Sequence, residues 1–357
     1  MKKSAVLICL IFFACDYFNT EFEDIEDPVY YESSSKTAAV QGPAVLKVMN
    51  YNLKFGGARI DFFFDCHGDR VLLGESEVIA NTNNLTALIN SENPDILVVQ
   101  EIDTNSKRTA YVDQVEYILN RTQFNYAVYA SQWKSDFIPS DGIGRVNSGN
   151  AIFSRWPFIS AERIQLPLRT DQSSLDLYFY LKRNILKSNI NLGGGKTTYV
   201  VATHTSAYST DGTKKKQIDI FKSELDKINA AGEKLIAAGD LNTIPPGSAK
   251  TSNFPDSVCA DEYVADDYTE ETTWLNSFYD ELDPVNGYTP AISLADYGTT
   301  ELQNEPYYTH TTDKNGFWNR KLDYIFTNMT LSSTGSVLQN TMTLSDHAPV
   351  IVTITVP

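Results

Sequence analysis

Several short apolar segments of this chain end on, or begin beside, a polar side chain that can bind a metal or carry a proton. The clearest is at the C-terminus, where Ser345-Asp346-His347-Ala348-Pro349 leads into residues 350–356, which alternate like a half-buried strand. The arrangement recurs at Asn52, at Glu101, at His204, and at Asp240 with Asn242. In layered α/β proteins strand ends share one edge, where sites form. The pattern therefore predicts one site built from distant parts of the sequence.

The order of the expected elements favours an α/β fold with mixed sheets. Helical spacing of apolar residues predicts helices over residues 75–91 and 214–230, and a further helix is expected over residues 108–120. Between them lie apolar segments expected to be strands, with a hairpin turn at 193–195. Residues 131–148 and 245–319 are expected to be largely irregular. Because no repeat of about 20–50 residues is present, a solenoid or propeller is disfavoured.

The N-terminal residues predict export and a three-part chain. Lys2 and Lys3 precede a short apolar run that ends in Ala14-Cys15, a pattern typical of a bacterial lipoprotein signal over residues 1–15 in which Cys15 becomes lipidated. An ordinary secretory signal cut nearby is the alternative, and both place the mature protein outside the cytoplasm. Residues 16–43 are acidic and rich in serine, which predicts a disordered tether, and residues 44–357 form the expected catalytic domain.

Charge and cysteine content narrow the classes of function. The net charge of −16 argues against nucleic-acid binding through bulk charge, although a local basic groove remains compatible with it. Outside the leader region Cys66 and Cys259 remain, and in an oxidising compartment they form either a disulfide or two unpaired thiols. No cysteine spacing of the metal-binding kind is present, which excludes a zinc-thiolate site.

The polar residues at the strand ends suit hydrolysis of a phosphate ester. Asn52, Glu101, Asp240 and Asp346 offer oxygen ligands, which match a hard divalent ion such as Mg²⁺, with Mn²⁺ or Ca²⁺ as alternatives. A metal and hydrogen-bond donors would neutralise the phosphoryl oxygens while a base activates water. Acyl hydrolysis fits less well, because no serine elbow or cysteine nucleophile stands beside a histidine.

A set of ordered motifs resembles the endonuclease/exonuclease/phosphatase superfamily, in its deoxyribonuclease I-like form. The motifs are Met49-Asn50-Tyr51-Asn52, Val99-Gln100-Glu101, residues 148–155, Thr203-His204-Thr205, Gly239-Asp240-Leu241-Asn242, residues 321–325 and residues 345–349. They follow the order of the family and extend from Ala44 to the C-terminus. The resemblance implies two packed mixed β-sheets flanked by helices, a four-layer sandwich.

The same resemblance implies residues that hold the metal and the phosphate group. Asn52 and Glu101 would bind the metal, Glu101 most directly, and Asp346 would lie near it. His204 and Asn242 would grip the scissile phosphate. For Asn52 the alternative is a side chain that only caps a turn.

The resemblance also implies residues that move protons or border the substrate. Asp240 would orient or deprotonate water, and His347 would act as acid and base, oriented by Asp323. The alternative for Asp323 is a buried partner of a neighbouring cation. Asn150 would contact the phosphate or be structural, and the loop that carries Arg145 would border the site.

The expected activity is hydrolysis of a phosphodiester, with nuclease and phospholipid or sphingomyelin phosphodiesterase as substrate classes. Alternatives are a phosphomonoesterase acting on inositol phosphates and a catalytically silent surface lipoprotein that acts as a binding module. The expected partners are the substrate and, through Cys15, a membrane. The protein is expected to be a monomer.

Overall fold

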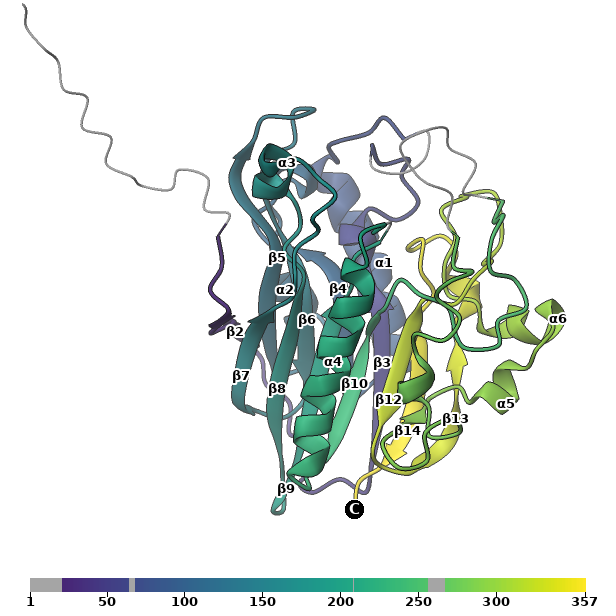
Figure 1. The fold of residues 1–357 in the computed structure, drawn as a ribbon. Coiled ribbons are helices and arrows are strands. Elements are labelled where there is room, and N and C mark those ends of the chain that lie inside the picture. Colours follow the sequence, from purple (N-terminus) through teal and green to yellow (C-terminus); the bar gives the residue numbers. More distant parts are fainter. Residues whose placement is uncertain (1–20, 64–67, 208, 256–266) are drawn as a thin grey trace, which may run out of the picture.

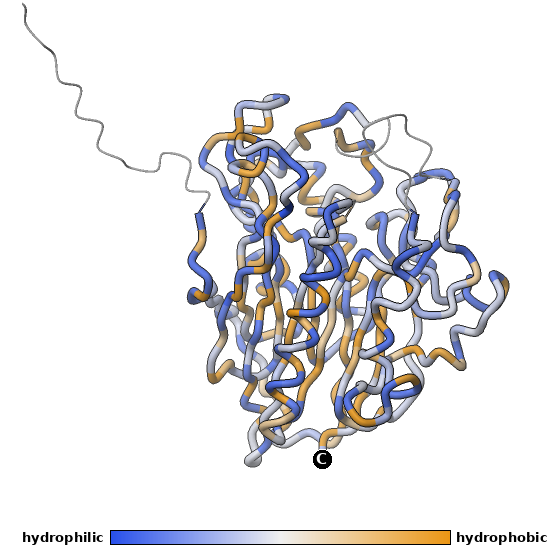
Figure 2. Tube along the Cα trace, viewed as in Figure 1, coloured by the Kyte–Doolittle hydropathy of each residue, from blue (hydrophilic) through white to orange (hydrophobic). Residues whose placement is uncertain are grey.

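Two β-sheets pack face to face in the computed structural model, which describes residues 21–63, 68–207, 209–255 and 267–357 (Figure 1). The main core lies between them, where Val48, Val98 and Val350 of one sheet meet Val200 and Ile236 of the other. Figure 2 shows apolar residues gathered along the strands. This mixed α/β sandwich confirms the expected fold class.

The first sheet has seven strands in the order β1-β7-β8-β9-β10-β12-β11. Their bounds are β1 Ile25–Glu26, β7 Phe158–Gln165, β8 Asn184–Gly193, β9 Lys196–His204, β10 Leu235–Asp240, β12 Asp323–Thr327 and β11 Thr289–Pro290. Strands β9 and β10 are parallel, β10 and β12 antiparallel. The predicted hairpin at residues 193–195 joins β8 to β9, where the glycines supply the positive φ angles of the turn.

The second sheet has seven strands in the order β13-β14-β3-β4-β6-β5-β2. Their bounds are β13 Leu331–Val337, β14 Val350–Thr355, β3 Val45–Asn52, β4 Ile96–Asp103, β6 Gly144–Ser154, β5 Tyr126–Ile138 and β2 Val29–Glu32. Strands β3 and β4 are parallel, and β14 pairs antiparallel with β3. The C-terminal strand β14 therefore lies inside the sheet, between β13 and β3, although it is last in the sequence.

Helices cover the outer faces of both sheets. The helix α1, Glu75–Glu92, packs with α2, Gln114–Leu119, against the second sheet. The helix α4, Thr213–Ala230, buries Ile218, Phe221 and Leu225 against the first sheet, as its apolar spacing predicts. In the described part of the connections lie the short helices α3 Ser174–Phe179, α5 Leu294–Tyr297 and α6 Glu301–Asn304. Among the described residues, no helix is long and apolar enough to span a membrane.

Several predicted elements were wrong in extent. The segment 108–120 contains a 3-10 turn, Lys107–Thr109, and only the short helix α2, because Asp113 caps α2 and starts it late. Residues 131–148 are not a loop: β5 and β6 extend through most of them as a long hairpin, stabilised by a small cluster around Trp133 and Val146. The described residues of the segment 245–319 contain short helices and β11 and are otherwise irregular, as expected.

The predicted disordered tether at residues 16–43 was also wrong where the structure describes it. Strand β1 pairs with β7, and β2 pairs with β5, so this segment adds an edge strand to each sheet. The buried guanidinium of Arg163 lies 3.9 Å from the ring centre of Phe22 and 3.8 Å from Glu26. Pairing with β7 and β5 gives this segment backbone hydrogen bonds that order it. Its amino-acid composition did not indicate this pairing. The predicted signal and Cys15 lie outside the described residues.

The strand register brings the predicted site residues to one end of the sandwich. Asp240 at the end of β10 is level with His204 on β9 and with Asp323 on β12. In the second sheet Asn52 ends β3, and the neighbouring β4 carries Glu101. The loop before β14 adds Asp346 and His347. The predicted gathering of strand ends is therefore confirmed.

Candidate active site

A cavity of about 510 Å³ opens at this end of the sandwich. Its lining includes Glu101, His204, Asp240, Asn242, Asp346 and His347, all from the predicted set. Further lining comes from cations and aromatic rings that the sequence motifs did not indicate, among them Lys54, Arg108, Trp133, Arg169, Tyr180 and Arg183. Such a concave, mixed surface with convergent charged groups is typical of an enzyme site.

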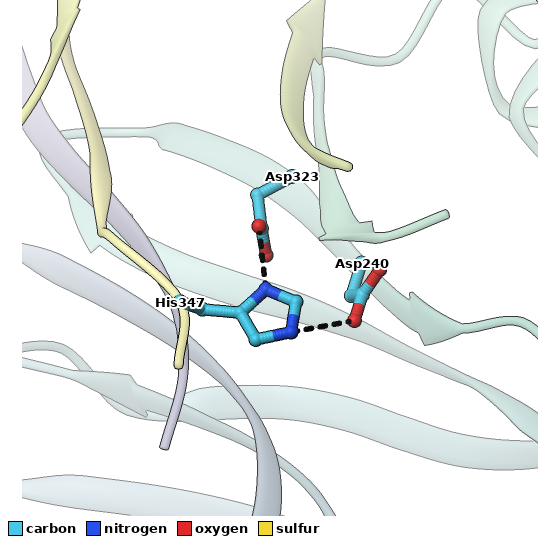
Figure 3. A group of neighbouring side chains, drawn as sticks. All are labelled: Asp240, Asp323 and His347. Atoms are coloured by element: carbon cyan, nitrogen blue, oxygen red, sulfur yellow. Dashed lines mark hydrogen bonds and ion pairs between the residues drawn. The ribbon is translucent and has the colours of Figure 1, made fainter. Parts of the chain in front are cut away.

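The imidazole of His347 lies between two carboxylates (Figure 3). Its Nδ1 is 2.8 Å from Oδ2 of Asp323, and its Nε2 is 3.6 Å from Oδ2 of Asp240. The backbone N–H of Asp323 donates to the hydroxyl of Thr309, which fixes the start of β12. Asp323 is therefore a partner of His347, as the resemblance implied, rather than of a neighbouring cation alone.

The protonation of this pair differs from that of free side chains. Burial lowers the pKa of His347, but the charges of Asp323 and Asp240 outweigh burial and raise it to about 10. Burial raises the pKa of Asp240 to about 7, against the opposing attraction of His347. A protonated imidazole thus faces a carboxyl group that can exchange a proton near neutral pH. This is the arrangement required for general acid–base chemistry.

Asn52 connects Asp240 to Glu101. Its Nδ2 donates to Oε1 of Glu101 and to Oδ2 of Asp240, each at 3.1 Å. Its Oδ1 accepts from the backbone N–H of Lys54 at 3.1 Å, so Asn52 also caps a turn. The turn-capping alternative is therefore confirmed, and the same side chain also contacts Glu101, the other residue expected to hold the metal.

Backbone strain concentrates around the same cavity. Lys54, Glu101 and Asn242 have φ angles of 43°, 53° and 46°, a left-handed region that costs a non-glycine residue free energy. Glu101 lies where the pairing of β4 with β6 shifts register between Val99 and Ile102. The irregularity turns Glu101 towards the cavity instead of continuing the ladder. Strained residues of this kind gather at sites where position matters more than local stability.

Asp346 forms an ion pair with a residue that the motifs did not indicate. Its Oδ2 is 3.1 Å from Nζ of Lys54, and both side chains are nearly buried. Burial opposes ionisation of Asp346, but the charge of Lys54 and that of His347 hold its pKa well below the usual range. Lys54 follows Asn52 by two positions, so it lay within reach of that motif.

His204 and Asn242, the residues predicted to bind the scissile phosphate, both contact Asp240. Nε2 of His204 is 3.4 Å from Oδ2 of Asp240. The backbone N–H of Asn242 donates to Oδ1 of Asp240 at 3.0 Å, while its side-chain amide donates to the carbonyl of Thr205. Lys214 donates to the carbonyl of Asn242 at 2.7 Å and thereby holds this turn. The structure thus brings Asn242 and His204 together around one carboxylate.

Two residues predicted to bind substrate do not line the cavity. Asn150 is fully buried, and its Nδ2 donates to Oδ1 of Asn184 at 3.3 Å, between the sheets. Arg145 lies on the long hairpin, where its guanidinium is 2.9 Å from Asp136 and partly exposed. The sequence placed Asn150 near the site through its own motif and Arg145 through its loop, but β6 positions both side chains outside the cavity lining.

Replacement of Arg145 by alanine is therefore expected to leave kcat/KM within about 2-fold of the wild-type value. An exposed ion pair of this kind contributes at most about 1 kcal/mol, so stability should also change little. Steady-state kinetics on any substrate of the protein would check this. A loss of about 10-fold would show that the hairpin reaches the bound substrate.

Other polar residues of the cavity form a wall from two loops. Nε and NH2 of Arg169 donate to the two carboxylate oxygens of Asp171, at 2.9 and 2.8 Å, and Asp171 also accepts from Thr210. In the opposite direction, Thr170 of the first loop donates to Asp211 of the second. No motif marks these residues, and only their reciprocal contacts reveal the wall. The candidate disulfide residues Cys66 and Cys259 lie outside the described part of the chain.

Comparison with known proteins agrees with this geometry. The sequence pattern of the Endonuclease/Exonuclease/phosphatase family matches residues 50–347, whereas no curated protein matches. Similar solved structures include an endonuclease/exonuclease/phosphatase from Beutenbergia cavernae DSM 12333, with TM-score 0.54 and 17% identity over 88% of this chain and 72% of that chain. Another, from Bacteroides vulgatus, has TM-score 0.51 and 12% identity over 88% of this chain and 100% of that chain.

A third similar structure is the mannosyl-6-phosphatase Bt3783 of Bacteroides thetaiotaomicron VPI-5482. It has TM-score 0.50 and 14% identity, and the match covers 87% of this chain and 99% of that chain. At these identities the structures show a shared fold, and the family pattern spans most of the chain. The chain therefore belongs to the endonuclease/exonuclease/phosphatase family, whose members are hydrolases that act on phosphoesters.

Proposed function

We propose that this protein is a divalent-metal-dependent phosphoesterase that hydrolyses a phosphodiester outside the cytoplasm. The observation that carries the proposal is the position of His347, held between Asp323 and Asp240 on a cavity that also contains Glu101. His347 carries a proton between two carboxylates. Burial raises the pKa of Asp240 to about 7, near the pH at which such an enzyme works. These residues can activate water and protonate the leaving group.

The donor atoms around the cavity suit a hard divalent ion. Glu101 and Asp346 line it with carboxylate oxygens, and Asn52 adds an amide beside Glu101. We assign these residues to hold Mg²⁺, with Mn²⁺ or Ca²⁺ as alternatives. When bound, the ion would polarise a phosphoryl oxygen and offset its charge. Asp240, Asp323 and His347 also bring possible ligand atoms within 4.8 Å of one another, but the hydrogen bond from His347 to Asp323 explains that group without an ion.

Positive charge in the cavity supports recognition of a phosphate group. Arg183 lines the cavity although it is almost completely buried, and its Nε has no hydrogen-bond partner among the described residues. A buried donor of this kind costs free energy unless a ligand satisfies it. Lys54 also lines the cavity, beside Asp346. A phosphate oxygen would satisfy the free donor and neutralise the charge.

Nucleic acid and phospholipid are the substrate classes that we propose for a diesterase. The fold is shared with a Danio rerio TDP2 that was crystallised with a single-strand DNA product. A phosphomonoester of a small, hydroxyl-rich group is the second candidate, which the polar wall of Arg169, Asp171 and Tyr180 favours. The fold shared with a mannosyl-6-phosphatase is compatible with it.

The site of action follows from the N-terminal sequence. We propose that residues 1–15 direct export and that Cys15 becomes a lipid anchor, with secretion as the alternative. The protein would then act on substrates at the cell surface or in the periplasm, as a monomer. Radiolabelled palmitate incorporation that a Cys15→Ala variant abolishes would support the anchor, and incorporation by both proteins would contradict it.

A metal-dependent hydrolysis panel tests the function. The panel contains plasmid DNA, RNA, sphingomyelin, phosphatidylinositol phosphates, mannose 6-phosphate and bis-p-nitrophenyl phosphate, each with Mg²⁺ and with a chelator. Activity that requires the metal identifies a phosphoesterase and its substrate class. Silence on every ester, with a folded protein and bound metal, would favour a binding module on the cell surface.

Replacement of Glu101 by glutamine is expected to weaken metal activation. The change removes one negative charge from the proposed ligand set but keeps the shape of the side chain, so the Mg²⁺ concentration for half-maximal activity should rise by at least about 10-fold. A Mg²⁺ titration of the initial rate measures this shift. The surface variant Glu77→Gln is the matched control, and an unchanged titration of Glu101→Gln would remove Glu101 from the ligand set.

A further inference from the structure

The two ring nitrogens of His204 face different kinds of partner. Nε2 lies 3.4 Å from a carboxylate oxygen of Asp240, while Nδ1 lies 3.5 Å from Nε2 of Gln132. A neutral imidazole has one nitrogen that donates and one that accepts. Which nitrogen carries the proton therefore depends on the orientation of the Gln132 amide.

Arg183 fixes that orientation. Its NH1 donates to Oε1 of Gln132 at 3.2 Å, within the buried region between the sheets. A guanidinium group has only donors, so the glutamine must present its oxygen to Arg183. The NH₂ of Gln132 then faces His204, and Nδ1 of His204 must accept. The proton is left on Nε2, which points at Asp240.

A β-bulge places Gln132 where it can do this. Ser131 of β5 pairs with Gly149 of β6 and Trp133 pairs with Ser148, so Gln132 is an extra residue in the ladder. Such a bulge redirects a side chain, and bulges are frequent beside active sites. A Cβ on Gly149 would lie 2.0 Å from the carbonyl oxygen of Ala130, so no larger residue fits opposite the bulge without a shift of the backbone.

The opposite sheet and Lys182, which lies just before its strand β8, bind the backbone carbonyl groups at the bulge. The backbone N–H of Lys182 donates to the carbonyl of Gln132 at 2.6 Å. The carbonyl of Ser131 accepts from Arg163 and from Asn184, each at 2.9 Å. The bulge is therefore held through the carbonyls of both Ser131 and Gln132, and Gln132 has no exposed surface. A glutamine so completely held has little freedom to turn its amide.

We propose that Gln132 and Arg183 are positioning residues that lock His204 in its neutral, Nε2-protonated tautomer, so that it acts as a hydrogen-bond donor at the catalytic carboxylate and not as a base. The tautomer follows from the contacts alone, and only its use in catalysis rests on the proposed phosphoesterase function.

The two histidines beside Asp240 thereby receive different roles. His347 meets carboxylates at both nitrogens, which favours the doubly protonated ring. His204 meets a donor at Nδ1, and burial together with the charges of Arg183 and His347 moves its pKa well below the usual value. A neutral donor can stabilise charge on a phosphoryl oxygen without removing a proton from the reaction. His347 and Asp240 then carry out the acid–base chemistry.

Nitrogen NMR of the histidine rings tests the tautomer directly. The whole chain is labelled with ¹⁵N-histidine, and long-range ¹H–¹⁵N spectra are recorded at neutral pH. The chain has four histidines, so single asparagine variants of the other three assign His204 by elimination even if a His204 variant fails to fold. We expect a protonated Nε2 and an unprotonated Nδ1. A proton on Nδ1, or on both nitrogens, would overturn the proposal.

Gln132→Glu is the informative variant, because a carboxylate beside Nδ1 can only accept. A proton is expected on Nδ1 of His204, and because the ring then faces carboxylates at both nitrogens, as His347 does, Nε2 keeps its proton as well, while the spectra of His347 stay the same. Gln303→Glu is the matched control: Gln303 belongs to a capping box on an exposed helix, where glutamate serves equally well. An unprotonated Nδ1 in Gln132→Glu would show that Gln132 does not set the tautomer.

Kinetics then test whether the tautomer matters for catalysis. With any substrate identified in the panel, Gln132→Glu is expected to lower kcat by at least about 10²-fold, since a wrong histidine tautomer in a serine-protease triad costs about 10⁴-fold. Full activity together with a proton on Nδ1 would overturn the catalytic role. If no phosphoester is hydrolysed at all, the proposed function fails, and the spectra still decide the tautomer.

Discussion

Replacement of His347 by alanine is expected to lower kcat by about 10²–10⁴-fold, the usual contribution of a positioned acid–base group. The variant removes the proton carrier between Asp323 and Asp240, and no other imidazole is held by both carboxylates among the described residues. Initial rates on the best substrate of the panel measure the loss. Imidazole added to the buffer should restore part of the activity, because the vacated space lies on the cavity.

The fold of this variant must be checked, because the removed group is buried. Without the protonated ring, Asp240 and Asp323 would repel each other, and we expect the pKa of Asp240 to rise further so that it binds a proton. Near-ultraviolet circular dichroism at 25 °C should match that of the wild-type protein. An unfolded variant would give His347 a structural role, and activity above about 10% of the wild-type value would exclude it as the acid–base group.

Replacement of Arg108 by methionine is expected to reduce the free energy of unfolding by about 3–5 kcal/mol, the cost of leaving one charge of a buried pair without its partner. Nε and NH2 of Arg108 donate to the two oxygens of Asp103, each at 2.8 Å, and both side chains are almost inaccessible. The guanidinium also lies 3.8 Å from the ring centre of Phe55. Denaturant unfolding followed by circular dichroism measures the change.

The chain offers a matched control for this substitution. Arg70 forms the same two-fold contact with Glu77, at 2.8 and 2.7 Å, but both side chains are more than a third exposed. Because water screens such a pair, Arg70→Met should cost no more than about 1 kcal/mol. Equal losses in the two variants would show that burial is not what makes the Arg108 pair important.

Local patterns predicted much of the fold. The spacing of apolar residues correctly located α1 and α4, since each helix needs only one apolar face against its sheet. The strands that end on Asn52, His204 and Asp240 were also visible, because a buried strand is a continuous apolar run with a polar residue at its mouth. The ends of strands were predicted less well where pairing with another strand decides them, as in the long hairpin of β5 and β6.

The sequence by itself determined which chemistry this protein can perform, because the identities of the carboxylates, amides and histidines are fixed in the chain. Only the tertiary structure decided which of them meet. Asp240 pairs with Asp323 and His204 through the strand register, and Lys54 reaches Asp346 across the sheet edge. Arg145, on a loop before a motif, and Asn150, inside that motif, do not line the cavity.

Gln132 shows most clearly which contacts could not be predicted from the sequence alone. It stands in no motif, and nothing in the local sequence marks it. It reaches His204 because one extra residue in β5 redirects its side chain and because Arg183, just before β8 of the other sheet, donates to it. Local sequence sets side-chain chemistry and secondary-structure preference, whereas contacts between residues far apart depend on how strands pair and where the pairing shifts.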